Sequence, residues 1–220
     1  MPDDNDSRNN HGTGGVMTES VREDSEFDIV LPAPPESTPT IIYSQRLILR
    51  AVRDSDAEGL FAVRSREDAV RTLWPFIPDA DVSATRKWMA LKTFTAPPCA
   101  VGLSYQFVIL HVDDPAGRII GTVGMNELVP VPTLGYLIHP EEWGKGYATE
   151  ATSTMINAWW SLPRRRENRK RDKLYALCNE KNRGSFKVLL KCGFQVVGEQ
   201  TMEDGAVLKN FELERPDWSL

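Results

Sequence analysis

A strand-like run, a turn with two glycines and a helix follow one another in the second half of the chain, and this order restricts the fold and the site more than any other feature. The run is residues 134–139, the glycines are Gly144 and Gly146, and the helical pattern covers residues 148–160. A helix begins with about four unpaired backbone N–H groups and a partial positive charge. Glycines let a phosphate approach such groups closely, and Lys145 adds a positive charge. The segment predicts a site for a phosphate or pyrophosphate; a plain turn, tightened by its glycines, is the alternative.

The two common nucleotide motifs do not fit this segment. In the motif G-x-x-x-x-G-K-[ST] the lysine follows the second glycine, whereas Lys145 precedes Gly146. The motif G-x-G-x-x-G requires a third glycine, which is absent here. The segment therefore predicts a phosphate site without indicating which phosphate compound binds.

Hydrophobic periodicity predicts strands and helices along the rest of the chain. Asp54 is predicted to cap a first helix that includes Val63, and Ser83 a second helix that ends near residue 91 or 94. Further helices are expected at residues 148–160 and 183–192. The expected strands are residues 46–52, 105–112, 118–128, 134–139, 174–179, 194–200 and 207–214. This order predicts an α/β fold with a mixed sheet and helices on its faces.

Composition limits the domain organisation and the location. The chain has 220 residues, 41% of them hydrophobic, which is enough for one core. We expect residues 1–38, which hold nine acidic and two basic residues, to be a disordered acidic tail, and residues 39–220 to be a single domain. No run approaches the ~20 apolar residues of a membrane span, and the N-terminus lacks the apolar region of a secretory signal. Three scattered cysteines and isolated histidines indicate no disulfide framework and no metal site, which favours a cytoplasmic location.

Three blocks of the sequence resemble a known family. The loop at residues 143–148 (WGKGYA) resembles the Q/R-x-x-G-x-G/A pyrophosphate loop of the GNAT superfamily of N-acetyltransferases. In the branch of RimJ/RimL-like ribosomal-protein acetyltransferases, a Trp often replaces the Q/R, as Trp143 does here. Residues 182–194 are similar to that branch's N-x-x-S…KxGF signature, and residues 45–50 (QRLILR) are similar to its opening strand. The resemblance covers residues 43–214.

The resemblance implies a fold and a cofactor. The fold would be a mostly antiparallel, twisted sheet with helices on both faces and one splayed parallel pair, residues 134–139 and 174–179. Acetyl-CoA would lie in the splay, with its pyrophosphate on the backbone amides of the loop and its pantetheine arm along the strand edge. The N–H of Ile138 would polarise the thioester carbonyl. The implied cofactor-binding residues are Leu137, Ile138, His139, Trp143, Gly144, Lys145, Gly146, Tyr147, Ala148, Thr149, Asn182 and Ser185.

The resemblance also implies direct attack of an amine on the thioester. Ser185 would donate to the leaving sulfur or position it, since Leu189 stands where many relatives carry a tyrosine. Glu127 is the candidate base, acting through a water, with a solvated strand end as its alternative. Trp74 and Phe76 would line the acceptor pocket.

Four further residues near the site receive assignments that need no catalytic role. Glu141 and Glu142 flank the loop, where a carboxylate would repel the cofactor, so both are assigned to the surface. Glu150 is assigned to the favourable dipole of its helix. Asn182 is predicted to cap the helix that contains Ser185.

A basic stretch at residues 163–173 lies outside the resemblance and contains seven Lys or Arg residues. It is interpreted as a solvated loop, a contact for nucleic acid or for the acidic tail, or a nuclear-import signal, which adds a nuclear location as an alternative. The sequence therefore leaves three classes of function. The first is an N-acetyltransferase acting on a protein N-terminus or a small-molecule amine. The second is a CoA-binding regulatory module without catalysis. The third is an RNA-associated protein, which the acidic pI of 5.3 disfavours.

Overall fold

A computed structural model describes residues 41–71, 73, 77–92, 105–128, 131–163 and 172–216. Within these ranges the chain forms one eight-stranded sheet with the order β1-β2-β3-β4-β5-β6-β8-β7. The strands are β1 (Ile41–Tyr43), β2 (Leu47–Ala51), β3 (Tyr105–His111), β4 (Ile119–Glu127), β5 (Thr133–Ile138), β6 (Lys173–Asn179), β7 (Gln195–Thr201) and β8 (Val207–Glu214). The helices are α1 (Ala57–Arg64), α2 (Glu67–Val70), α3 (Val82–Ala90), α4 (Tyr147–Ser161) and α5 (Arg183–Lys191), with 3-10 helices at Asp54–Asp56 and Pro140–Glu142.

The structure confirms the predicted mixed sheet. Every neighbouring pair of strands is antiparallel except β5 and β6, which are parallel. The predicted helix cap at Ser83 is wrong by two residues. The side chain of Asp81 accepts from the Ala84 amide and caps α3, because a carboxylate at this position reaches the free amides of the first turn.

The predicted cap at Asp54 is also wrong. Asp54 begins a 3-10 helix instead, and α1 starts only at Ala57. The carboxylate of Asp56 accepts from the Arg53 amide and binds the guanidinium of Arg50 with two hydrogen bonds of 3.0 and 2.7 Å. This charged pair, rather than a cap, fixes the entry into α1.

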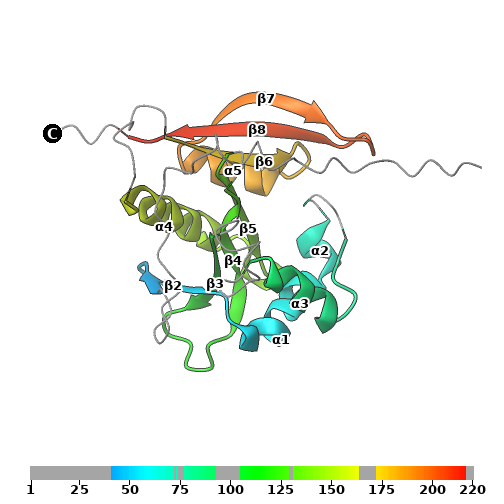
Figure 1. The fold of residues 1–220 in the computed structure, drawn as a ribbon, viewed down its shortest axis with the longest axis vertical. Helices are drawn as coiled ribbons and strands as arrows, with labels where there is room; N and C mark the ends of the chain where they lie inside the picture. Colours follow the sequence, from blue (N-terminus) through cyan, green and yellow to red (C-terminus); the bar gives the residue numbers. More distant parts are fainter. Residues whose placement is uncertain are drawn as a thin grey trace, which may run out of the picture.

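Helices cover both faces of the sheet (Figure 1). On one face, α4 and α5 pack on a core that includes Phe107, Trp159 and Phe211, all fully buried. On the opposite face, α1, α2 and α3 pack on a second core that includes Leu60, Val63 and Val108. Two cores therefore hold the sheet between them.

Strands β5 and β6 diverge after a single point of pairing. Thr133 pairs with Tyr175, and no later residue of β5 pairs with β6. A strand that leaves its neighbour exposes the N–H and C=O groups on that edge. The second half of β5 therefore presents an open edge toward β6, beside α5 (Figure 1).

Several predicted segments lie outside the described residues. These are the tail at residues 1–38, most of the basic stretch at residues 163–173, and the aromatic residues Trp74 and Phe76. Among the described helices, none is both long enough and apolar enough to cross a membrane.

Gly121 allows β4 and β5 to approach closely at the open end of the splay. A Cβ atom at this position would lie 2.1 Å from the carbonyl oxygen of Leu137 and 3.1 Å from the Cα atom of Ile138. Both neighbours are backbone atoms, so the two strands would have to move apart.

We therefore expect Gly121→Ala to lower the free energy of unfolding by about 1 to 3 kcal/mol, the range for overpacked sites, measured by urea denaturation. Gly198→Ala in β7 is the matched control, because its Cβ atom would meet only the Asn210 side chain at 3.7 Å. Equal effects of the two substitutions would contradict the close approach of β4 and β5.

Candidate functional site

A cavity of about 500 Å³ opens where β5 and β6 diverge. Its walls come from β5, the loop between β5 and α4, the first turn of α4, α5 with the turn before it, and α2 with the residues that follow it. Three segments that are distant in sequence therefore contribute to one site.

Most of the predicted cofactor-binding residues line this cavity. Those that do are Leu137, Ile138, Trp143, Gly144, Gly146, Tyr147, Ala148, Thr149, Asn182 and Ser185. His139 and Lys145 are not among the lining residues. The structure thus brings together the loop and the helix that the sequence analysis treated as separate blocks.

The two glycines of the loop adopt a backbone conformation that side chains disfavour. Gly144 has φ 77° and Gly146 has φ 86°. Gly146 is the N-cap residue of α4, and no side chain caps the helix there. Because no N-cap side chain occupies the first amides of α4, these amides can bind an anion in the cavity.

The open edge of β5 is set by the alternation of its hydrogen bonds. The N–H of His139 donates to Ile120 of β4 over 2.8 Å, and Gly121 lies against the Leu137 carbonyl. In an antiparallel pair, residues alternate between facing their partner strand and facing away from it. Ile138 therefore faces away from β4, and its carbonyl accepts from the Trp143 indole at 2.8 Å. Its N–H lies on the same open edge as the cavity.

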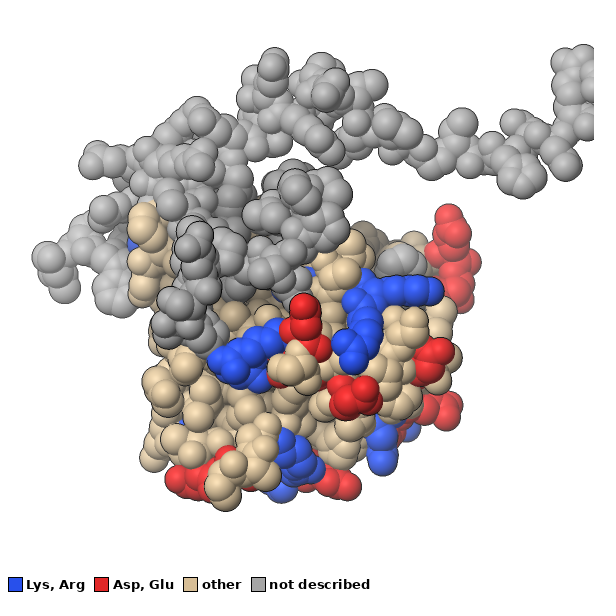
Figure 2. All heavy atoms as spheres, turned by 60° about the horizontal axis from the view of Figure 1, so that its bottom comes forward, with Lys and Arg blue, Asp and Glu red and all other residues tan. Residues whose placement is uncertain are grey.

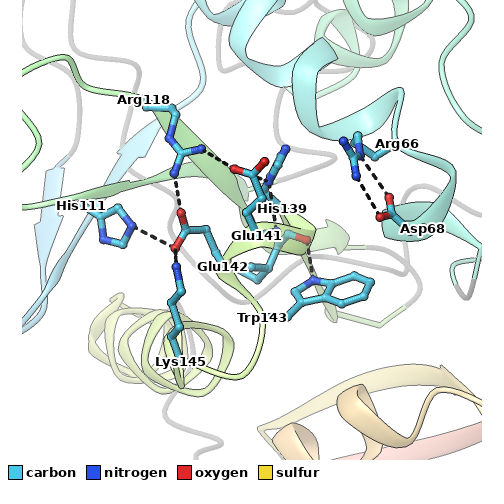
Figure 3. Close-up of polar contacts among 10 residues, drawn as sticks. Arg66, Asp68, His111, Arg118, His139, Glu141, Glu142, Trp143 and Lys145 are labelled. Carbon is cyan, nitrogen blue, oxygen red and sulfur yellow. Dashed lines mark hydrogen bonds and ion pairs between the residues drawn. The ribbon is translucent and has the colours of Figure 1, made fainter.

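Glu142 is buried, although we expected it at the surface. Its side chain is 5% exposed. The carboxylate binds the Lys145 ammonium at 2.9 Å and the Arg118 guanidinium, and His111 lies 3.4 Å away (Figure 3). The prediction failed because two of these partners, His111 at the end of β3 and Arg118 just before β4, are distant from Glu142 in sequence and approach it only in the folded chain. The Lys145 charge is therefore engaged by Glu142 rather than free for an anion.

The charged partners of Glu142 shift its pKa. Burial by itself would raise the pKa of this carboxyl, but the hydrogen bond from Lys145 and the charges of Lys145, His111 and Arg118 hold it below its ordinary value. The side chain of the neighbouring Glu141 is 65% exposed; its carboxylate lies 3.3 Å from the Arg118 guanidinium and 3.9 Å from Nδ1 of His139 (Figure 3).

A second carboxylate, Glu150, fixes the other side of the loop. It accepts from the Ser44 hydroxyl at 2.8 Å, from the Arg46 amide at 2.8 Å and from the Arg46 guanidinium at 2.7 Å. Arg46 also donates to the carbonyl of Lys145 and lies over the Tyr147 ring. Glu150 thus joins the turn between β1 and β2 to the start of α4, which is more than the dipole effect assigned to it.

The charge of the cavity wall is positive. Five cations line it: Arg71, Lys181, Arg183, Lys187 and Lys191. The two carboxylates in the lining, Asp68 and Glu142, are both paired with cations. Four of the five cations lie on α5 or in the turn before it, so this part of the wall can attract a polyanion.

Ser185 meets a tyrosine that the sequence analysis did not assign. The Tyr136 hydroxyl donates to Ser185 Oγ at 2.8 Å, across the opening between β5 and α5. Asn182 caps α5 as predicted, with its side chain accepting from the Ser185 amide at 3.0 Å. Alternation along β5 was the available signal, since it puts Tyr136 and Ile138 on the same face of the strand.

The remaining predicted residues are Glu127, Trp74 and Phe76. Glu127 is exposed at the end of β4 and does not line it. Trp74 and Phe76 lie outside the described residues. In the ranges that the structure covers, no three or more Cys, His, Asp or Glu side chains gather in a way that would hold a metal ion.

Comparison with known proteins identifies the same family that the sequence motifs resemble. The sequence profile of the acetyltransferase (GNAT) domain matches residues 46–195. A curated relative, described as the uncharacterized N-acetyltransferase YoaA of Bacillus subtilis (strain 168), is 26% identical over 171 residues, covering 72% of this chain and 84% of the relative.

Two solved structures share the fold at low sequence identity. The ribosomal-protein-S5-alanine acetyltransferase of Vibrio fischeri has a TM-score of 0.61 and 21% identity, over 82% of this chain and 100% of the other. RimL, a ribosomal L7/L12 α-N-protein acetyltransferase solved with coenzyme A, has a TM-score of 0.61 and 17% identity, over 80% and 98% of the two chains.

The contacts of Glu142 predict a dependence of stability on pH. Because the pKa of Glu142 is lower in the folded chain than its ordinary value of 4.5, the unfolded chain binds this proton more tightly. The stability that Glu142 contributes is therefore complete above pH ~5 and is lost as the pH falls through the folded pKa. We expect Glu142→Gln to lower the free energy of unfolding at pH 7 by about 1.5 to 3 kcal/mol, and to reduce the loss of stability between pH ~5 and pH ~3.

Urea denaturation across this pH range measures both effects. The matched control is Glu141→Gln, which removes the adjacent, exposed carboxylate and should change stability by at most about 1 kcal/mol. A Glu142→Gln variant as stable as the wild-type chain at pH 7 would show that the buried cluster does not hold the loop.

Proposed function

The chain belongs to the GNAT family of acetyltransferases, and from this premise we propose that it transfers the acetyl group of acetyl-CoA to a primary amine by direct attack on the thioester. The observation that carries the proposal is the juxtaposition of an uncapped helix N-terminus, an open strand edge and a basic wall around one cavity. The helix start and the basic wall fit the phosphates of acetyl-CoA, and the open strand edge fits its pantetheine arm.

The phosphates of acetyl-CoA fit the loop and the start of α4. Free amides at the helix start and the conformations of Gly144 and Gly146 form a cradle for a pyrophosphate. The proposed contacts are the amides of Gly144, Lys145, Gly146, Tyr147 and Ala148, together with the Thr149 hydroxyl. The cations of α5 supply the charge that Lys145 does not, because Lys145 is paired with Glu142.

The pantetheine arm fits the open edge of β5. Its amides can pair with a strand edge as an added strand would. Leu137 and Ile138 line the cavity there, and the Ile138 N–H faces away from β4. We assign to this N–H the polarisation of the thioester carbonyl, since a fixed donor stabilises the charge that develops on that oxygen.

Ser185 is the proposed partner of the sulfur. It lies at the start of α5 on the wall opposite Ile138, and Leu189, one turn further along, is buried and cannot donate. Acetyl-CoA supplies an activated acyl group when bound, and the residues of this chain hold and orient it. Glu127 remains the proposed base, acting through a water from outside the cavity wall.

The acceptor is proposed to be a protein N-terminus, as in the RimJ/RimL-like branch. This choice is supported by the two ribosomal-protein acetyltransferases that share the fold, at 21% and 17% identity. A small-molecule amine is the alternative, and Trp74 and Phe76 stay the proposed acceptor residues. A cytoplasmic location remains a prediction; the curated relative YoaA comes from a bacterium, and nothing in the comparisons favours a nuclear location.

Contact of the basic stretch with nucleic acid or with the acidic tail also stays a prediction. On the face drawn in Figure 2, the described residues show basic and acidic side chains interspersed. Such a mixed surface gives an RNA backbone no continuous basic track.

A second candidate function is a CoA-binding module without catalysis. It is favoured because neither carboxylate of the described cavity wall is available as a base. Asp68 and Glu142 are both ion-paired, and Glu127 does not line the cavity. A base is needed for acetyl transfer but not for CoA binding. Measuring both CoA binding and acetyl transfer therefore distinguishes the two functions.

We expect acetyl-CoA to release free thiol when the protein is given a suitable amine. The panel consists of peptides that begin with Ser, Ala or Thr, polyamines and aminoglycosides, and the readout is the free thiol of CoA. Gly146→Pro should abolish release and CoA binding, because it removes an amide and cannot adopt φ 86°.

Gly117→Pro is the matched control. Gly117 also has positive φ, at 62°, and its amide also forms part of a turn, between β3 and β4. Circular dichroism verifies that both variants fold. CoA binding without thiol release for any amine would favour the second candidate, and an absence of CoA binding in the wild-type chain would contradict both.

A further inference from the structure

Tyr136 and Ser185 connect the two walls of the cavity. Tyr136 lies in the middle of β5, Ser185 lies in the first turn of α5, and both line the cavity. The 2.8 Å hydrogen bond between their hydroxyl groups spans the gap that the divergence of β5 and β6 creates. It joins a side chain of β5 directly to the first turn of α5.

The buried environment of Tyr136 keeps its phenol protonated, so that the O–H remains able to donate a hydrogen bond. Its ring packs against the core between the sheet and the helices α4 and α5. Burial raises the pKa of this phenol, so it stays protonated throughout the neutral range. Both hydroxyl groups can donate and accept, and in the structure the phenol of Tyr136 donates to Ser185 Oγ.

Ser185 is held at two points. Its amide donates to the Asn182 side chain at 3.0 Å, which fixes the backbone, and its hydroxyl oxygen accepts from Tyr136. A serine hydroxyl carries one hydrogen and two lone pairs. When Tyr136 occupies a lone pair, the hydrogen of Ser185 must point away from Tyr136.

We propose that Tyr136 is a positioning residue, which accepts no proton itself but directs the Ser185 O–H toward the sulfur of the bound thioester. The proposal rests on the proposed function and adds to it a residue that was not assigned a role. Without Tyr136, the Ser185 hydroxyl could rotate and donate elsewhere.

The step in which this hydrogen bond matters is the loss of the thiol. The amine nitrogen forms a bond to the carbonyl carbon, and the C–S bond breaks with its electron pair on the sulfur. The hydrogen bond from Ser185 stabilises the resulting thiolate without proton transfer. The attacking nitrogen releases one proton to water and the thiolate takes one proton from water, so the charges balance.

The first test measures the pKa of the CoA thiol bound to the protein, by its absorbance as a thiolate. A donor to the sulfur stabilises the thiolate and lowers this pKa. We expect Tyr136→Phe and Ser185→Ala to raise the bound thiol pKa by a similar amount, about 0.4 to 1 unit for one hydrogen bond. Tyr175→Phe is the matched control, because Tyr175 lies on β6 and does not line the cavity.

The second test follows turnover in a double-mutant cycle. Tyr136→Phe should lower kcat by about three- to tenfold, as one hydrogen bond would, with the KM for acetyl-CoA unchanged. If Tyr136 acts through Ser185, adding Tyr136→Phe to Ser185→Ala should cause no further loss.

The outcomes separate this proposal from the proposed function. Bound CoA whose thiol pKa is the same in Tyr136→Phe and wild type overturns the role of Tyr136 alone. A full further loss of kcat in the double variant also overturns it, because Tyr136 would then act independently of Ser185. An absence of CoA binding in the wild-type chain overturns the proposed function and this inference together.

Discussion

The divergence of β5 and β6 is the constraint on which the rest of the site depends. The two parallel strands pair at one position, Thr133 with Tyr175, and then separate. A strand in the middle of a sheet normally has both edges occupied, so this separation leaves backbone groups of β5 free in an otherwise paired sheet. It also opens the cavity into which the start of α4 and the start of α5 both point. On its other edge β5 pairs closely with β4, which Gly121 permits. The alternation of that pairing turns the backbone N–H of Ile138, rather than that of Leu137, toward this space.

Buried charge then fixes the loop that crosses the open end. Glu142 and Glu150 lie on either side of it, and each holds a cation that is close to the free amides of α4, Lys145 and Arg46 respectively. An unpaired carboxylate beside an anion site would repel the anion, but Glu142 and Glu150 are each paired with a cation, so their charges are largely compensated. What they provide is position, because the loop glycines are otherwise free to adopt many conformations. Most of the basic residues that line the cavity lie on α5 or in the turn before it, on the opposite wall.

Local signals predicted the elements, and the order of the elements predicted the mixed sheet. The loop at residues 143–148 and the Asn182 cap were readable because glycine spacing and capping act within a few residues of sequence. The sequence did not predict three contacts that join segments which only the folded sheet brings together. These are the ion pairs that bury Glu142, the contact of Glu150 with Arg46, and the hydrogen bond of Tyr136 with Ser185. Glu127 was chosen as the best remaining carboxylate, and its role as base stays a prediction. It lies at the end of β4 outside the cavity lining, so it would act through a water.

Amide hydrogen exchange with and without coenzyme A tests the central claim most directly, because it reports which backbone groups the cofactor covers. If the divergence of β5 and β6 holds the cofactor, CoA should slow exchange at the amides of residues 144–148 and at Ile138. It should leave Leu137, which faces β4, and the edge strand β7 unchanged. Protection of β7 or of the outer strands β1 and β2, with residues 144–148 and Ile138 unaffected, would contradict the account.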